Sequence, residues 1–269
     1  MCLIVLAYRV HPDYPVIIAA NRDEFYNRPA LALHQWEPGP SVVAGRDLEG
    51  GGTWMGVHPN GRMAALTNYR EPGVRIPNAP SRGHLVSDFL QGRETLNNYL
   101  KKLQSIGSDY NGFNLLLSEG ERWIYYSNRG GAPQELQPGV HGLSNHLLNT
   151  PWPKTVRSCR AMKNHLSSQR PPDVGSLMKL LQDRAVPPDK DLPQTGVGLE
   201  WERRLGTVFI HSPIYGTRAS TVLLVARDGK ARICERTFDH DGFTGEVAQT
   251  FTMPAKPPGG SGACPKVLK

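Results

Sequence analysis

The segment that decides the fold is MCLIVLAYRVHPDYPVIIAANRDEF, which spans residues 1–25. Two apolar runs, Leu3–Tyr8 and Val16–Ala20, flank the turn-forming sequence His-Pro-Asp-Tyr-Pro, and this arrangement predicts a β-hairpin. The first run has neither the basic residues nor the small-residue cleavage site of a secretory signal peptide. We therefore interpret it as the first strand of a protein that stays in the cytoplasm.

The remaining sequence alternates between blocks of strands and blocks of helices. Strands are expected at Thr53–Val57, Arg62–Thr67, Phe113–Leu117, Trp123–Ser127, Val208–His211, Ser220–Ala226 and Ala231–Thr237. Helices are expected at Ser81–Gln91, with Ser81 as its N-cap, and at Thr95–Gln104, Lys154–Leu166 and Val174–Gln182. This order predicts an α+β protein in which helices cover antiparallel sheets. We expect residues 1–253 to form a single domain and residues 254–269, rich in proline and glycine, to be a disordered tail.

Composition excludes several classes of protein. The 269 residues carry a formal net charge of +7, yet no run of lysine and arginine exceeds two residues, which argues against nucleic-acid binding. No apolar run approaches the roughly 18 residues that a membrane-spanning helix needs. The four cysteines match no zinc-ligand spacing and no CxxC motif, so no metal site is predicted; they are Cys2, Cys159, Cys234 and Cys264.

Cys2 is the first candidate for chemistry because it follows the initiator methionine. Its small side chain permits removal of Met1, which would leave an α-amine with a pKa of about 7.7–8.0. One residue would then supply both a thiol nucleophile and a base for its proton. The simpler interpretation is that Cys2 only begins a buried edge strand.

The polar block Asn21–Glu24 directly follows the second predicted strand. Asp23 is a candidate to accept a hydrogen bond from the amine of residue 2 and so to orient it. Arg22 is a candidate to hold a substrate anion. A turn with a solvated ion pair would explain the same residues.

Three more polar positions lie beside predicted strands or helices. Asn68, with Tyr69, follows one strand, and Asn145 precedes a helix. Asparagine amides are neutral donors that suit an oxyanion hole, although each asparagine alone is also a common turn residue. Arg218 stands at the entrance to a buried strand, where it needs a partner such as Asp23 or a ligand carboxylate.

Taken together, these motifs make the sequence recognisable. The segments MCLI, AANRDEFYNRP, GGTWMGV, AALTNYREP, GLSN with TPWPK, and YGTRASTVLLV resemble the NRDE family, the transport and Golgi organization protein 2 homologues. The resemblance extends from Cys2 to about Val225. It implies an N-terminal-nucleophile hydrolase fold, in which two stacked antiparallel sheets lie between helices as four layers, αββα. The pattern is also similar to that of the bile-salt hydrolases and penicillin acylases, which cleave amide bonds with an N-terminal cysteine.

The resemblance implies roles for particular residues. It assigns catalysis to Cys2, Asp23, Asn68, Asn145 and Arg218 and matches Asn21 to the asparagine that precedes the catalytic aspartate. Substrate contact is expected from the polar positions Asn21, Arg22, Glu24 and Tyr69. The hydrolases carry an arginine in an R-N-x-D stretch, and this arginine has no counterpart here, because Ala20 stands in its place.

Two functions are therefore expected from the sequence. The first is hydrolysis of an amide or thioester bond in a small acylated substrate, with Cys2 as the nucleophile. The alternative is a non-catalytic carrier that binds haem, acyl-CoA or another lipid anion in the same pocket. No cofactor is expected, haem being considered only as a bound ligand, and the sequence does not set the oligomeric state.

Overall fold

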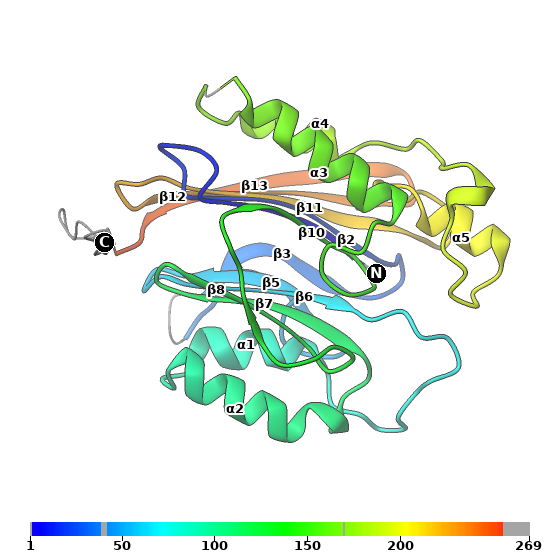
Figure 1. Cartoon of the computed structure of the whole chain (residues 1–269), viewed down its shortest axis with the longest axis horizontal. Coiled ribbons are helices and arrows are strands. Elements are labelled where there is room, and N and C mark those ends of the chain that lie inside the picture. Colours follow the sequence, from blue (N-terminus) through cyan, green and yellow to red (C-terminus); the bar gives the residue numbers. More distant parts are fainter. Residues whose placement is uncertain (1, 39–41, 169, 255–269) are drawn as a thin grey trace, which may run out of the picture.

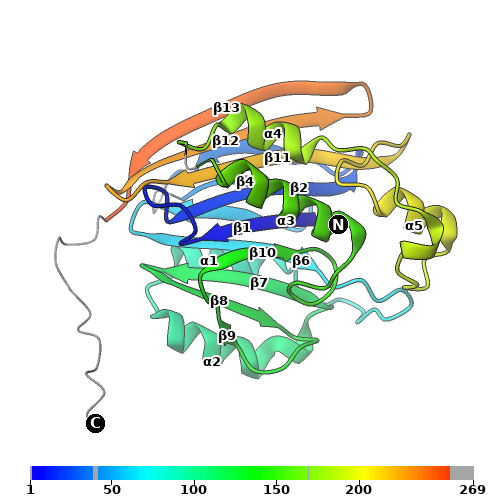
Figure 2. The same cartoon turned by 45° about the horizontal axis from the view of Figure 1, so that its top comes forward.

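The computed structural model describes residues 2–38, 42–168 and 170–254. The predicted tail, apart from Pro254, lies outside the described residues. Two sheets, in which all described strand pairs are antiparallel, stack on one another (Figures 1 and 2). The first is a six-stranded sheet in the order β10 (Gly139–Leu143), β1 (Cys2–Tyr8), β2 (Val16–Phe25), β11 (Tyr215–Val225), β12 (Lys230–Asp239) and β13 (Gly242–Thr252). The second is a seven-stranded sheet in the order β3 (Ala30–Gln35), β4 (Val43–Asp47), β5 (Met55–His58), β6 (Arg62–Asn68), β7 (Phe113–Glu119), β8 (Arg122–Ser127) and β9 (Gln134–Glu135).

Helices cover the outer face of each sheet, which completes the four predicted layers. Helices α1 (Gly83–Gln91) and α2 (Leu96–Ile106) lie against the seven-stranded sheet (Figure 1). Helices α3 (Pro153–Leu166) and α4 (Val174–Leu181) lie against the six-stranded sheet. The short elements η1 (Gly107–Asp109), η2 (Asp189–Asp191) and α5 (Leu199–Leu205) complete the chain. No helix among residues 2–38, 42–168 and 170–254 is long and apolar enough to cross a membrane.

The alternation of side chains along β1 explains why this strand is apolar on both faces. Ile4 and Leu6 point into the core between the two sheets, whereas Leu3 and Val5 pack under α3 and α4. Both faces are covered, so both must be apolar. The same alternation continues along β2, and it decides which polar side chains of that strand reach which face.

The structure corrects several predicted elements. Strand β2 continues to Phe25, so the polar block Asn21–Glu24 lies within the strand and not after it. Val208–His211 is not a strand, since only His211 forms a bridge, to Gly216. Helix α1 begins at Gly83 with Arg82 as the N-cap residue and no side-chain cap, so Ser81 is not the N-cap.

The strands and the helix that the sequence did not predict are those whose apolar residues show only a weak periodicity. They are β3, β4, β9, β10, β13 and α5. Strand β13 is an edge strand with largely polar or exposed positions, and α5 is only seven residues long. Such elements depend on neighbouring strands or helices for their stability and carry little periodicity of their own.

Candidate functional site

A cavity of about 510 Å³ opens beside Cys2, at the start of β1. Its wall combines residues from the β1–β2 hairpin, the glycine segment Gly50–Gly51 and the start of α1. Charged residues dominate this wall; they are Arg22, Asp23, Glu24, Arg28, Asp47, Glu49, Arg75 and Arg82. The volume suits a small ligand, and the polar lining favours one that is charged.

Cys2 is fixed at the cavity through its backbone. It pairs with Arg22 in the β1–β2 ladder, and the hydroxyl of Ser144 donates to its carbonyl oxygen at 3.1 Å. Burial raises the pKa of the thiol, and the charge of Asp23 raises it further, while a hydrogen bond from the backbone of Asp23 acts in the opposite direction. The thiol therefore needs a base to become a nucleophile at neutral pH.

Asp23 lies on the opposite face of the sheet from Arg22, and only 1% of it is exposed. The hydroxyl of Thr217 donates to its Oδ1 at 2.7 Å, and the hydroxyl of Tyr215 donates to its backbone carbonyl at 2.9 Å. Burial raises the pKa of its carboxyl, and the charge of Lys154 is the strongest opposing effect. A carboxylate is thus held close to the start of β1, where the amine of residue 2 would lie.

Arg22 reaches into the space between the sheets. Its guanidinium donates to Oδ2 of Asp47 at 3.0 Å and stacks over Trp54, 4.3 Å from the ring centroid. Arg28 donates to the same carboxylate from Nε at 2.8 Å. Partial burial works against ionisation of Asp47, but the bonds from Arg28 and from the backbone of Gly50 hold its pKa below the ordinary value. The two arginines are therefore pre-positioned at the cavity wall.

The two asparagines predicted for an oxyanion hole lie next to one another. Asn68 lines the cavity with Cys2. Asn145 is fully buried, and its Nδ2 donates to the carbonyl of Asn68 at 2.9 Å while Ser144 donates to its Oδ1 at 3.3 Å. The structure thus brings Cys2, Asp23 and both asparagines to the same end of the sandwich.

Other predicted residues are placed differently. Asn21 uses its amide within the scaffold: Nδ2 donates to the carbonyls of Leu181 and Val208, and Oδ1 accepts from Ser220. Asn21 therefore ties β2 to the end of α4 and does not line the Cys2 cavity. Glu24 does line the cavity, and it accepts from the backbone of Phe25.

Arg218 and Tyr69 also lie outside the wall of this cavity. Arg218 occupies the bulge where the pairing of β11 with β2 shifts register. Its guanidinium donates to the carbonyls of Phe25, Tyr26 and Arg28 from Nη1 and to that of Phe238 from Nε. The expected pairing of Arg218 with Asp23 is replaced by these bonds, because the bulge turns the side chain toward the connection after β2. The ring of Tyr69 packs against His146, with centroids 5.0 Å apart.

Several residues at the site were not singled out from the sequence. Arg28, Arg75, Arg82 and His84 line the cavity, and Arg82 donates to the carbonyl of Gly112 at 2.9 Å. Three consecutive glycines, Gly50–Gly52, are a sequence signal for this region. A Cβ at Gly52 would lie 2.3 Å from the carbonyl carbon of Gly83, so the triplet allows a close backbone approach to the start of α1.

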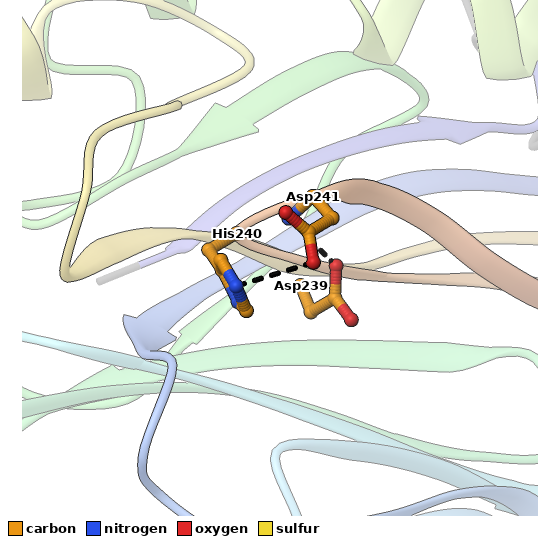
Figure 3. A group of neighbouring side chains, drawn as sticks. All are labelled: Asp239, His240 and Asp241. Atoms are coloured by element: carbon orange, nitrogen blue, oxygen red, sulfur yellow. Dashed lines mark hydrogen bonds and ion pairs between the residues drawn. The ribbon is translucent and has the colours of Figure 1, made fainter.

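A separate group of ligand-type side chains lies at the β12–β13 hairpin, as Figure 3 shows. Asp239 accepts hydrogen bonds from the backbone N–H groups of Asp241 and Gly242, and His240 pairs with Asp241 at 3.2 Å. These are the contacts of a turn, so the group is explained by the hairpin itself.

Two antiparallel sheets stacked between helices are the arrangement of the N-terminal-nucleophile hydrolase fold. The family model described as Transport and Golgi organisation 2 matches residues 1–240, and the chain belongs to that family. It is 39% identical to the Transport and Golgi organization protein 2 homolog of Bos taurus, over 88% of this chain and 93% of that protein. It is 28% identical to Transport and Golgi organization protein 2 of Drosophila melanogaster, over 88% and 92% of the two chains.

Solved structures support the fold alone. A mutant of the conjugated bile acid hydrolase from Clostridium perfringens superposes with a TM-score of 0.50, over 96% of this chain and 100% of that one. The sequences are 8% identical, so the likeness concerns the arrangement of sheets and helices and not the substrate.

Proposed function

We propose that this protein hydrolyses the amide or thioester bond of a small acylated anion, with Cys2 as the nucleophile. The observation that carries the proposal is the position of Cys2 at a cavity of about 510 Å³, with Asp23 behind it and Asn68 in the same wall. A nucleophile, a carboxylate and an amide donor at one end of the sheet are the parts that acyl transfer requires.

The chemistry needs the α-amine of residue 2, and therefore removal of Met1. The thiol attacks the acyl carbonyl, and its proton passes to that amine. The amine then protonates the leaving nitrogen as the C–N bond breaks, which leaves a thioester on Cys2. Water, deprotonated by the same amine, hydrolyses the thioester and restores the thiol. A thioester substrate follows the same path with a thiol as the leaving group.

One of the two asparagines supplies the proposed donor for the tetrahedral intermediates. The amide of Asn68 is the proposed donor in the cavity wall, and Asn145 holds the backbone of that residue. Donors that are fixed before the reaction stabilise negative charge more effectively than solvent does.

The wall carries four arginines beside four carboxylates, and the proposal of an anionic substrate rests on the arginines as donors. Arg82 reaches the cavity from the start of α1, and Arg22 and Arg28 are held there by Asp47. Guanidinium groups bind carboxylates and phosphates through paired N–H donors. We propose that the group bound here belongs to the part of the substrate that leaves with the nitrogen or sulfur.

A carrier of anionic acyl compounds is the second candidate, because the same arginines would bind an acyl-CoA or lipid anion without cleaving it. Haem is the weaker version of this proposal, since a polar wall offers little apolar surface to a macrocycle. Neither version needs a free amine on residue 2. Cytoplasmic location likewise stays a prediction of the sequence.

The test begins with the intact mass of the full chain, which reports whether Met1 is removed. The processed protein is then incubated with N-acyl amino acids, with the matching neutral acyl amides and with acyl thioesters of the same acyl chain, and the products are measured by mass spectrometry. We expect the anionic substrates to be cleaved, with activity lost in Cys2→Ala. Cys159→Ser is the matched control, because Cys159 lies on α3 and should leave activity unchanged.

Full activity in Cys2→Ala would exclude the proposed mechanism. Retention of Met1 in the main species would do the same, because the amine of residue 2 would then be blocked. Saturable binding of acyl-CoA to Cys2→Ala, without turnover by the unmodified protein, would support the carrier instead.

A further inference from the structure

One charged side chain at the site has no part in the chemistry described above. Lys154 lies in the first turn of α3, and only 1% of it is exposed. Its Nζ has no hydrogen-bond partner within residues 2–38, 42–168 and 170–254. Burying an ammonium group without such a partner is costly, and an apolar side chain of similar length would fill the same space without that cost. A packing role alone does not account for a lysine at this position.

The fold places Lys154 over the start of β1. Helix α3 packs against β10 and β1. Ser144 and Asn145 directly follow β10, and Ser144 holds the carbonyl of Cys2. The first turn of α3 therefore lies on the outer face of the six-stranded sheet, the face to which β2 also directs Asp23.

The charged and titratable groups around Lys154 come from four elements. They are Cys2 from β1, Asp23 from β2, Arg70 from the segment after β6 and Glu202 from α5. Arg70 and Glu202 form their own ion pair at 2.7 Å and so largely neutralise one another. Glu24, next to Asp23 in β2, and Tyr215 add to the negative charge near Asp23 only where they are ionised. The charge that balances Lys154 is therefore that of Asp23.

We infer that Lys154 is a positioning residue of this site, whose ammonium group keeps the buried carboxylate of Asp23 ionised and thereby sets the pH range in which Cys2 reacts. The inference rests on the proposed function only where it names Cys2 as the reacting residue. The electrostatic part concerns Asp23 and Lys154 and stands without any substrate.

The titration behaviour of the pair agrees with this role. Burial raises the pKa of Asp23, and the charge of Lys154 is the strongest effect that lowers it. Burial lowers the pKa of Lys154 to about 8, against the attraction of Asp23. An ionised Asp23 favours the protonated form of an amine at residue 2, which accepts the thiol proton. The ammonium of Lys154 offsets the opposing effect, by which the charge of Asp23 raises the pKa of the Cys2 thiol. Loss of the ammonium should therefore move the reaction of Cys2 to higher pH.

The direct test is the titration of Asp23 by carbon NMR, with aspartate labelled at the carboxyl carbon and the signal assigned from its absence in Asp23→Asn. We expect Lys154→Met to raise the midpoint of Asp23 by about one pH unit, a tenfold change in proton affinity. Lys154→Arg keeps the charge and should stay close to the unmodified protein. Lys163→Met, an exposed lysine on the same helix, is the matched control. Thermal melting verifies that each variant is folded.

The second readout is the rate at which iodoacetamide alkylates Cys2, followed by peptide mass spectrometry across a range of pH. We expect Lys154→Met to move the midpoint of this profile upward, and the change to be smaller when Asp23 is already asparagine, because the part that acts through Asp23 is then lost. A purely structural role would lower folding stability without this dependence on Asp23.

An unchanged midpoint of Asp23 in folded Lys154→Met would overturn the inference. So would a shifted midpoint of Asp23 with an unchanged alkylation profile. If no substrate is cleaved by the unmodified protein, the proposed hydrolysis fails, yet the NMR titration and the alkylation profile still decide the role of Lys154.

Discussion

The buried ion pair between Arg70 and Glu202 ties the segment after β6 to α5, and its disruption gives the most direct test of the packing around the site. Nη1 of Arg70 lies 2.7 Å from Oε2 of Glu202, and the two side chains are 4% and 5% exposed. The guanidinium also stacks over Trp152, 4.7 Å from the ring centroid, and the backbone N–H of Arg70 donates to Asn145 at 2.7 Å. The ion pair therefore stabilises the segment that follows Asn68, and this segment is itself hydrogen-bonded to Asn145.

Arg70→Met removes the cation and leaves Glu202 buried, with Thr195 donating to its Oε1 from backbone and hydroxyl. Removing one partner of a buried ion pair costs about 3–5 kcal/mol. Loss of the stacking on Trp152 adds about 0.5–2 kcal/mol. We expect a total loss of about 3.5–7 kcal/mol in the free energy of unfolding at neutral pH. In the double variant with Glu202→Met, most of that loss should be recovered, because no uncompensated charge stays buried.

Urea unfolding followed by tryptophan fluorescence measures these differences. The unpaired Glu202 of the Arg70→Met protein should bind a proton more tightly in the folded state than in the unfolded state. The deficit should therefore shrink as the pH falls toward about 5. A loss below about 1 kcal/mol in the single variant, or a double variant no more stable than the single one, would refute the reasoning.

Three further predictions follow from single contacts. Burial raises the pKa of Glu235 from 4.5 to about 7, so the folded state holds its proton more tightly. The free energy of unfolding should accordingly fall by about 3 kcal/mol as the pH rises through that interval. Urea titrations of Glu235→Gln should show that this dependence of stability on pH is lost. An unchanged dependence would contradict the raised pKa of Glu235. Gly52→Ala should lower the free energy of unfolding, measured by thermal melting, by at least about 2 kcal/mol, because φ is +70° and the new Cβ meets the backbone of Gly83. Gly131→Ala is the control, because open space surrounds that position and its stability should change little. Asn68→Ala should lower turnover of a cleaved substrate by about 10²–10³ with little effect on binding, and an undiminished kcat would remove Asn68 from the oxyanion hole.

The predicted and observed elements agree where the sequence pattern is strong. Helix α2 lies close to the expected Thr95–Gln104, and the hydroxyl of Thr95, its N-cap residue, accepts from the backbone N–H of Asn98. The apolar runs of β1, β7 and β8 appear as strands close to their predicted bounds. Each of these signals depends on residues only a few positions apart, so it is readable without knowing the fold.

The wrong predictions concern features that depend on residues far apart in the sequence. Asn21–Glu24 continues β2 because β11 pairs with the whole block and β1 pairs with its first two residues, although the block itself is polar. The pairing satisfies the backbone, and the alternation then sends Asp23 to one face and Arg22 to the other. Arg218 could not be placed from the sequence, since a bulge in β11 decides the direction of its side chain.

The sequence by itself determined the family and the class of fold, because the motifs from MCLI to YGTRASTVLLV and the order of apolar runs are local properties of the chain. It also identified Cys2, Asp23, Asn68 and Asn145 as candidates. Only the tertiary structure showed that these four lie at one end of the sandwich, that Asn21 serves the scaffold and that Lys154 is buried close to Asp23. The physical reason is that burial and charge at this site arise from strands and helices more than a hundred residues apart, and no local pattern records which of them meet.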